Sequence, residues 1–141
     1  MAVTIEIDVP GEPVPKGRPR LGRGRAYTPD RTRRAEEAVV WSWIAEGRPT
    51  LPADCYYEVE ATFTYALPAR PRHPYPGRSD LDNLAKLVID ALVTAGAIPD
   101  DRRMVALSCR KGYGPRSRSQ VVVRAHRGEE INAASPESAR G

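Results

Sequence analysis

Four aspartates and one lysine make up the part of the sequence best suited to chemistry. Asp80 and Asp82 stand two positions apart, and Asp100 and Asp101 follow further along the chain. Carboxylate oxygens are the ligands that Mg²⁺ prefers, and phosphate substrates supply further ligands. Lys86, four positions after Asp82, could donate to an attacking water or to the non-bridging oxygens of a phosphate. These residue types together are what a metal-dependent DNA hydrolase requires.

Each of these residues also has an ordinary structural interpretation. Asp80 and Asp82 precede a run of apolar residues with helical spacing. Acidic residues at the start of a helix satisfy free backbone N–H groups and interact favourably with the helix dipole. Lys86 could form a surface ion pair with Asp82. Taken singly, each residue is explained in this way, so the catalytic interpretation depends on their acting together.

Basic residues are concentrated in two blocks on either side of the acidic residues. Residues 15–34 contain eight basic residues and one acid, and residues 102–127 contain eight more and no acid. Clusters of Lys and Arg bind phosphates through counterion release, so a polyanion is the expected partner. A compositional bias is the alternative, because only three of the 22 basic residues are lysines. The candidate DNA contacts are Lys16, Arg18, Arg20, Arg23, Arg25 and Arg78.

Hydrophobic spacing predicts the elements that position these residues. Alternation of apolar and polar residues is typical of half-buried strands, and a helical period is typical of an amphipathic helix. These patterns predict strands at 3–9, 55–65, 104–111 and 120–125, and helices at 29–46 and 79–95. In the first helix, one or both of Trp41 and Trp43 should face the core. The element order favours an α+β fold, a single domain with one mixed β-sheet and two main helices packed on it.

The connections are rich in proline and glycine. Residues 10–29 should form a long basic loop without regular structure, with Thr28 as N-cap and Pro29 at the first helical position. Residues 67–78 should form a second loop, and the strands at 104–111 and 120–125 should be joined through 112–119. The polar residues 128–141 should be a disordered tail, which leaves 1–127 as the folded domain.

Composition excludes several classes of protein. With 141 residues, 40% hydrophobic and 28% charged, the chain has the profile of one soluble domain. No apolar stretch is long enough to span a bilayer, and the first residues do not resemble a signal peptide. The two cysteines stand far apart, which favours a reducing cytoplasmic compartment. The two histidines do not form a zinc-binding pattern with them.

Several motifs of this sequence resemble those of the RusA-type Holliday junction resolvases. The resemblance extends from about Val3 to Ala125. Its most specific part is the run of Asp80, Asp82, Asn83 and Lys86 with the Asp, Ala and Leu at 90–92, Gly96 and the Asp pair at 100–101. Supporting parts are the Pro-Lys-Gly-Arg-Pro-Arg segment at 15–20 and the Tyr-Thr-Pro at 27–29. The loop at 67–78 and the C-terminal tail depart from the family pattern.

The resemblance implies a RusA-like fold and a small homodimeric endonuclease. Such an enzyme uses Mg²⁺, needs no organic cofactor and cuts four-way DNA junctions in recombination and repair. The resemblance also implies that Asp80, Asp82 and Asp101 are metal ligands and that Lys86 is catalytic. An origin in bacteria, including their phages and prophages, and a cytoplasmic location without membrane contact would follow.

Two other functions remain open from the residues alone. A basic DNA-binding protein of phage or prophage origin would need no catalysis. It would gain nothing from three aspartates beside a phosphate track, because they repel DNA unless a cation intervenes. A metal-dependent phosphatase for a small substrate would have little use for two blocks of basic residues.

Chain geometry predicts that the metal site is completed across a dimer interface. A helix from Asp82 to Ala95 is roughly 20 Å long, and the short link from Ala95 to Asp101 reaches about 20 Å only when fully extended. Gly96 and Pro99 in that link favour a turn instead. A two-fold partner with its second helix antiparallel would bring its own Asp101 to this end. Whether the site forms within one chain, and whether Asp100 or Asp101 contributes, stays open.

Overall fold

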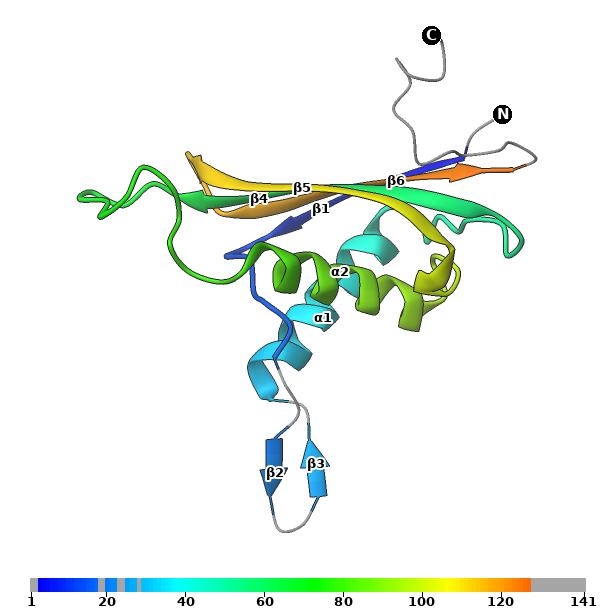
Figure 1. The fold of residues 1–141 in the computed structure, drawn as a ribbon, viewed down its shortest axis with the longest axis horizontal. Helices are drawn as coiled ribbons and strands as arrows, with labels where there is room; N and C mark the ends of the chain where they lie inside the picture. Colours follow the sequence, from blue (N-terminus) through cyan, green and yellow to red (C-terminus); the bar gives the residue numbers. More distant parts are fainter. Residues whose placement is uncertain (1–2, 18–19, 23–24, 28, 128–141) are drawn as a thin grey trace, which may run out of the picture.

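The structure is a computed structural model that describes residues 3–17, 20–22, 25–27 and 29–127. One four-stranded sheet carries two helices on the same face, so that the molecule has two layers (Figure 1). The helices are α1 (Asp30–Ala45) and α2 (Leu81–Ala95), and the strands of this sheet are β1 (Thr4–Pro10), β4 (Tyr56–Ala66), β5 (Met104–Gly114) and β6 (Arg118–His126). None of the described helices is long and apolar enough to cross a membrane.

The strand order in this sheet is β1-β6-β4-β5. Strand β6 pairs antiparallel with both β1 and β4, whereas β5 pairs parallel with β4. The sheet is therefore mixed, and the predicted α+β class with two helices on one sheet is confirmed. Strands β1 and β5 are the two edges of the sheet.

The core lies between the sheet and the helices. Strand β4 alternates as the sequence predicts, and Tyr57, Val59 and Phe63 are among its buried side chains. Helix α2 buries seven of its residues against the sheet (Leu84, Ala85, Leu87, Val88, Ile89, Ala91 and Leu92). In α1, Trp43 faces the core and its indole N–H donates to the carbonyl of Pro49 at 2.7 Å, whereas Trp41 is 66% exposed.

Helix α2 ends at a glycine. Gly96 has φ of 83°, a left-handed conformation that only glycine adopts readily. The N–H groups of Gly96 and Ala97 donate to the last carbonyls of the helix, at 3.1 and 2.9 Å. Beyond the turn, the 3₁₀ helix η1 (Asp101–Arg103) leads directly into β5. The chain therefore reverses at Gly96, and β5 returns alongside α2 toward the start of that helix.

Three predictions about boundaries are wrong. The segment 10–29 is not free of regular structure, because β2 (Arg20–Gly22) and β3 (Arg25–Tyr27) pair antiparallel. Both strands fit between the flanking prolines. Pro29 is the N-cap of α1 and not its first helical residue. The connection between β5 and β6 comprises only residues 115–117, because both strands are longer than predicted.

A close approach between strands explains why β5 extends through glycines. Gly114 pairs with Ala66 at the end of β4. A Cβ atom at Gly114 would come within 2.6 Å of the Thr64 side chain. The glycine that predicts a loop from the sequence therefore serves strand packing.

Arg18, Arg23, Thr28 and the tail at 128–141 lie outside the described residues, so the predictions made for them stay untested.

Candidate active site

Asp80 and Asp82 lie at the start of α2 with exposed carboxylates. Asp80 occupies the N-cap position with an extended backbone, but its side chain makes no capping hydrogen bond. Within the described part of the chain, neither carboxylate takes part in a hydrogen bond or an ion pair. The capping interpretation is therefore not realised for Asp80. Both carboxylates are free to bind a ligand.

The backbone before Asp80 is held from β5. Ser79 has φ of 65°, in the left-handed region that is unfavourable for residues other than glycine. The ammonium group of Lys111 donates to the Ser79 carbonyl at 2.7 Å and to the Arg78 carbonyl at 3.4 Å. Lys111 thus fixes the entry to α2. Sequence reasoning missed this role because Lys111 and Ser79 are distant in the chain and no local pattern connects them.

Lys16 contacts residues of both helices, α1 and α2. Its backbone N–H donates to the Asn83 carbonyl at 2.9 Å, and its ammonium nitrogen lies 2.8 Å from a Glu36 oxygen and 3.4 Å from an Asp90 oxygen. Burial acts to lower the pKa of Lys16, but the hydrogen bonds and charges of Glu36 and Asp90 outweigh it and raise the pKa. Lys16 therefore has an internal role in the free protein, and its predicted contact with DNA stays a prediction.

Gly17 allows the same segment to approach α1. Its N–H donates to the hydroxyl oxygen of Thr32 at 3.1 Å, and Thr32 is 2% exposed. A Cβ atom at Gly17 would collide with that hydroxyl oxygen. The Lys-Gly pair of the supporting motif is thus explained by packing. It anchors the chain shortly before β2.

Lys86 lies one helical turn after Asp82, but it pairs with a different acid. Its ammonium nitrogen is 3.8 Å from an oxygen of Asp90, the carboxylate that also binds Lys16. The Lys86 side chain is 57% exposed. The ion pair between Lys86 and Asp82, which the sequence allows, is absent from the described structure. Lys86 is accordingly available at the surface beside the start of α2.

Asp100 and Asp101 lie beyond the opposite end of α2. A helix of 15 residues is about 22 Å long at 1.5 Å per residue. Among the residues that the structure describes, no three His, Cys, Asp or Glu side chains are grouped so that they could hold a metal ion. One chain therefore does not bring Asp101 to Asp80 and Asp82. The three-ligand assignment stays a prediction.

The two acids at this end differ in their local partners. Asp100 accepts a hydrogen bond from the Arg102 N–H at 2.8 Å and lies 3.4 Å from the Arg102 guanidinium. The backbone hydrogen bond from Arg102 is the largest of the causes that lower the pKa of Asp100. Asp100 is thus committed to capping η1, whereas Asp101, exposed in the first turn of η1, does not serve as its cap.

Tyr57 on β4 holds the turn that carries these acids. Its hydroxyl lies 3.2 Å from the Pro99 carbonyl oxygen and 3.4 Å from that of Asp100, and it can donate to either. Burial, followed by the negative charges of Asp101 and Asp100, raises the pKa of Tyr57 to about 12. The hydroxyl therefore keeps its proton at neutral pH. The alternating pattern of β4 predicts Tyr57 as a core residue only and does not indicate this contact.

Two of the four predicted DNA contacts that the structure describes lie on the β2–β3 hairpin. Arg20 begins β2 and Arg25 begins β3, and Figure 1 shows these two strands standing away from the sheet and helices. Arg78 is exposed, and its guanidinium lies 3.2 Å from a carboxylate oxygen of Glu12. Basic residues on a projecting hairpin are suited to contact with a large polyanion.

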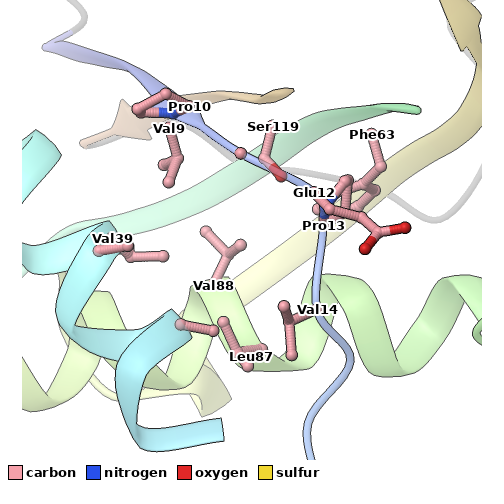
Figure 2. A pocket seen from close by; sticks show the side chains of 13 residues that line it. Val9, Pro10, Glu12, Pro13, Val14, Val39, Phe63, Leu87, Val88 and Ser119 are labelled. Carbon is pink, nitrogen blue, oxygen red and sulfur yellow. The ribbon is translucent and has the colours of Figure 1, made fainter. Parts of the chain in front are cut away.

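An apolar cavity lies between the two layers and is separate from the aspartates. Its volume is about 60 Å³. Figure 2 shows Val14, Leu87 and Val88 pointing toward it, whereas the Glu12 carboxylate points away. A cavity of this size and lining is a gap in core packing. The candidate site is instead the exposed surface at the start of α2.

Comparison with known proteins gives one family. The family model described as endodeoxyribonuclease RusA matches residues 10–124 of the 141-residue chain. The matched region includes Lys16, the start of α2, η1 and nearly all of β6. A search of curated proteins finds no match.

Proposed function

The chain belongs to the RusA family of endodeoxyribonucleases, and we propose that it is a magnesium-dependent enzyme that cuts four-way DNA junctions in recombination and repair. The observation that carries the proposal is the pair of exposed carboxylates, Asp80 and Asp82, without a partner in the described structure. Two free negative charges weaken binding to DNA unless a cation lies between them and the phosphate. Family membership and the uncommitted carboxylates thus favour the same kind of site.

The donor set at the start of α2 fits Mg²⁺. This ion is usually bound by one or two carboxylates, with waters and substrate phosphates as its other ligands. Asp80 and Asp82 would supply the two carboxylates of one chain, and Asp101 of a second copy would supply a third. When bound, the ion would neutralise charge on the phosphate and lower the pKa of a coordinated water.

The remaining residues of the site would hold the backbone in position and neutralise charge on the phosphate. Lys86, exposed beside Asp82, would donate to a non-bridging oxygen of the scissile phosphate. Lys111 would hold the backbone before Asp80 through its hydrogen bonds to the Ser79 and Arg78 carbonyls. We assign the third carboxylate to Asp101, because Asp100 caps η1.

The hairpin would supply affinity for the junction. We expect the arginines of the segment 18–25 and Arg78 to contact phosphates on either side of the cleavage site. Such contacts carry no sequence information, but they fix the orientation of the protein on DNA. Each cut phosphate could then be brought to the start of α2, which lies close to the Lys16 anchor of the hairpin.

Cleavage of a synthetic four-way junction tests this function. Wild-type protein should cut the junction in the presence of Mg²⁺ and should leave a linear duplex of the same sequence intact. Cleavage of the junction should stop when EDTA is added. Asp82→Asn should abolish cleavage, yet binding should persist or strengthen because one repulsive charge is removed. Asp54→Asn is the matched control, since Asp54 is an exposed acid that pairs with Arg127 elsewhere on the surface.

Two results would contradict the proposal. Cleavage by Asp82→Asn at the wild-type rate would show that Asp82 is not a metal ligand. Junction binding by wild-type protein without any cleavage in Mg²⁺ or Mn²⁺ would identify a DNA-binding protein instead of a nuclease.

A further inference from the structure

Lys86 lies midway between two acids on one stripe of α2. Asp82 precedes it by four positions and Asp90 follows it by four, and residues four apart are neighbours on the surface of a helix. An acid four positions before a lysine is the more favourable of the two arrangements, because it agrees with the helix dipole. Local preference alone therefore predicts that Lys86 pairs with Asp82.

The structure shows the opposite pairing. The Lys86 ammonium nitrogen lies 3.8 Å from an Asp90 oxygen, whereas no ion pair joins it to Asp82 in the part of the chain that the structure describes. A distance of 3.8 Å is too long for a hydrogen bond, so charge attraction holds the Lys86 ammonium group toward Asp90. Lys86 can therefore leave this position without breaking a hydrogen bond to Asp90.

Asp90 is a better-fixed partner for a lysine than Asp82. Its side chain is 27% exposed, and its oxygen lies 3.4 Å from the Lys16 ammonium nitrogen. Lys16 is fixed in turn by Glu36 at 2.8 Å and by a backbone hydrogen bond to α2. Asp82 is exposed and has no such support among the described residues. Together with Lys86, the group holds two positive and two negative charges, which balance.

An ion pair between Lys86 and Asp82 would interfere with the candidate site. A carboxylate that binds an ammonium group must give up this contact before it binds a metal ion, and the ammonium charge repels the arriving cation. The Asp82 carboxylate is therefore open to a cation only while Lys86 is held elsewhere.

We propose that Asp90 is a positioning residue that holds Lys86 away from Asp82 and so keeps the Asp82 carboxylate open for a divalent cation. The inference rests on the proposed function, because it concerns the same metal site. Lys16 completes the arrangement. Since Lys16 also neutralises Asp90, the movement of Lys86 to a phosphate oxygen leaves no unpaired charge behind.

Manganese binding in the absence of DNA tests this role. Mn²⁺ accepts the same oxygen ligands as Mg²⁺, and EPR spectroscopy measures the free ion directly. In Asp90→Asn, Lys86 should turn to Asp82, and the Mn²⁺ dissociation constant should rise about threefold at low ionic strength. The difference from wild type should shrink at high salt, because salt screens exposed ion pairs.

Glu36→Gln is the matched control for Asp90→Asn. The Glu36 side chain is 24% exposed and pairs with Lys16, as Asp90 does, but it forms no ion pair with Lys86. Its replacement removes the same charge from the group and should leave the Mn²⁺ dissociation constant near the wild-type value. Asp90→Glu, which retains the charge, should also bind Mn²⁺ as wild type does.

A double variant separates positioning from a general effect on the fold. Without the Lys86 ammonium group, nothing is released toward Asp82, so Asp90→Asn should no longer weaken Mn²⁺ binding. The comparison is between Lys86→Ala and Lys86→Ala combined with Asp90→Asn. A loss of structure would instead weaken binding equally in both backgrounds, and that result would overturn the positioning role.

Junction cleavage gives a second readout. The Mg²⁺ concentration for half-maximal cleavage should rise about threefold in Asp90→Asn. Saturating Mg²⁺ should recover most of the rate, because excess metal displaces Lys86 from Asp82. A lower maximal rate with an unchanged Mg²⁺ requirement would contradict the role given to Asp90.

The outcomes separate this inference from the proposed function. If Asp82→Asn weakens Mn²⁺ binding and Asp90→Asn does not, the metal site stands and the positioning role is overturned. If Asp82→Asn leaves Mn²⁺ binding unchanged, both are overturned, because the site itself is absent. A Lys86-dependent effect of Asp90→Asn in a protein that does not cut DNA would support the positioning role and overturn the proposed function.

Discussion

At the scale of single residues, the charged side chains differ in what they already bind. Lys16 neutralises two carboxylates, Glu36 and Asp90, at a partly buried position. Asp80 and Asp82 have no such partners in the described structure. A charged group that is satisfied internally gains less from an external ligand, because it must give up its existing contacts. The free carboxylates are therefore the stronger candidates for chemistry, and Lys16 is the stronger candidate for positioning.

Replacement of Lys16 tests its internal role. Lys16→Met should lower the free energy of unfolding by about 1 kcal/mol, because Glu36 and Asp90 would lose their shared counter-ion. The measurement is urea unfolding at neutral pH. Arg33→Met is the control, since Arg33 pairs with Asp30 while both side chains are well exposed, and such pairs contribute little. Equal stability of Lys16→Met and wild type would mean that the ion pairs do not stabilise the fold.

The raised pKa of Tyr57 predicts a pH dependence. A tyrosine with pKa of about 12 in the folded protein and 10 ordinarily binds its proton more tightly when folded. Its contribution to stability is therefore complete below pH 10 and is lost as the pH rises from 10 through 12. Between pH 8 and pH 11, wild type should lose about 1 kcal/mol more of its unfolding free energy than Tyr57→Phe. Tyr75→Phe, at an exposed site, should follow wild type, and parallel pH profiles for wild type and Tyr57→Phe would contradict this reasoning.

At the scale of elements, α2 and β5 form one antiparallel unit around the candidate site. Helix α2 begins at the free carboxylates and ends at the Gly96 turn, and β5 returns to the beginning of the helix. Tyr57 holds the turn at one end, and Lys111 holds the Ser79 backbone at the other. The site thus depends on both ends of this unit being fixed, although only one end carries Asp80 and Asp82.

The β2–β3 hairpin is expected to contact DNA. Arg20→Ala combined with Arg25→Ala should weaken junction binding and reduce the slope of log K against log salt concentration by about two, one for each lost phosphate contact. The control is Arg48→Ala combined with Arg70→Ala, because both arginines are exposed and lie outside the two basic blocks. Binding isotherms at several salt concentrations give the slopes. Equal slopes for the two double variants would show that the hairpin does not contact the phosphates.

At the scale of the whole molecule, the length of α2 separates the predicted metal ligands. Asp101 lies at one end of a 15-residue helix and Asp80 at the other, so a rigid single chain keeps them apart. A two-fold dimer would pair the start of one α2 with the end of the other. It would hold two equivalent sites, which suits paired cuts in a junction of similar symmetry.

Mixing two inactive variants tests this arrangement. In a dimer of one Asp82→Asn chain and one Asp101→Asn chain, a shared site places both changes in one of the two sites and leaves the other intact. Nicking of the junction should therefore recover in the mixture. If each site belonged to one chain, every site would carry a change, and the mixture would stay inactive despite proven subunit exchange.

The sequence by itself determined the main elements and the residues to test. The alternation of residues 55–65 and the helical period of 81–95 predict β4 and α2, because both elements bury one face and burial imposes its period on the sequence. The cluster of Asp80, Asp82 and Lys86 was likewise visible, because these residues belong to one short segment. Short strands between prolines were missed, since β2 and β3 have three residues each and no measurable period.

Only the tertiary structure decided which partner each side chain has. Lys16 binds acids on two helices, Lys111 reaches the Ser79 carbonyl, and Tyr57 contacts the turn after α2. The tertiary structure also placed β5 at an edge of the sheet, with Val105 and Leu107 exposed. These outcomes depend on how segments that are far apart in the chain pack together. Local patterns do not encode them, because a side chain's spacing predicts the face on which it lies and not the group that meets it there.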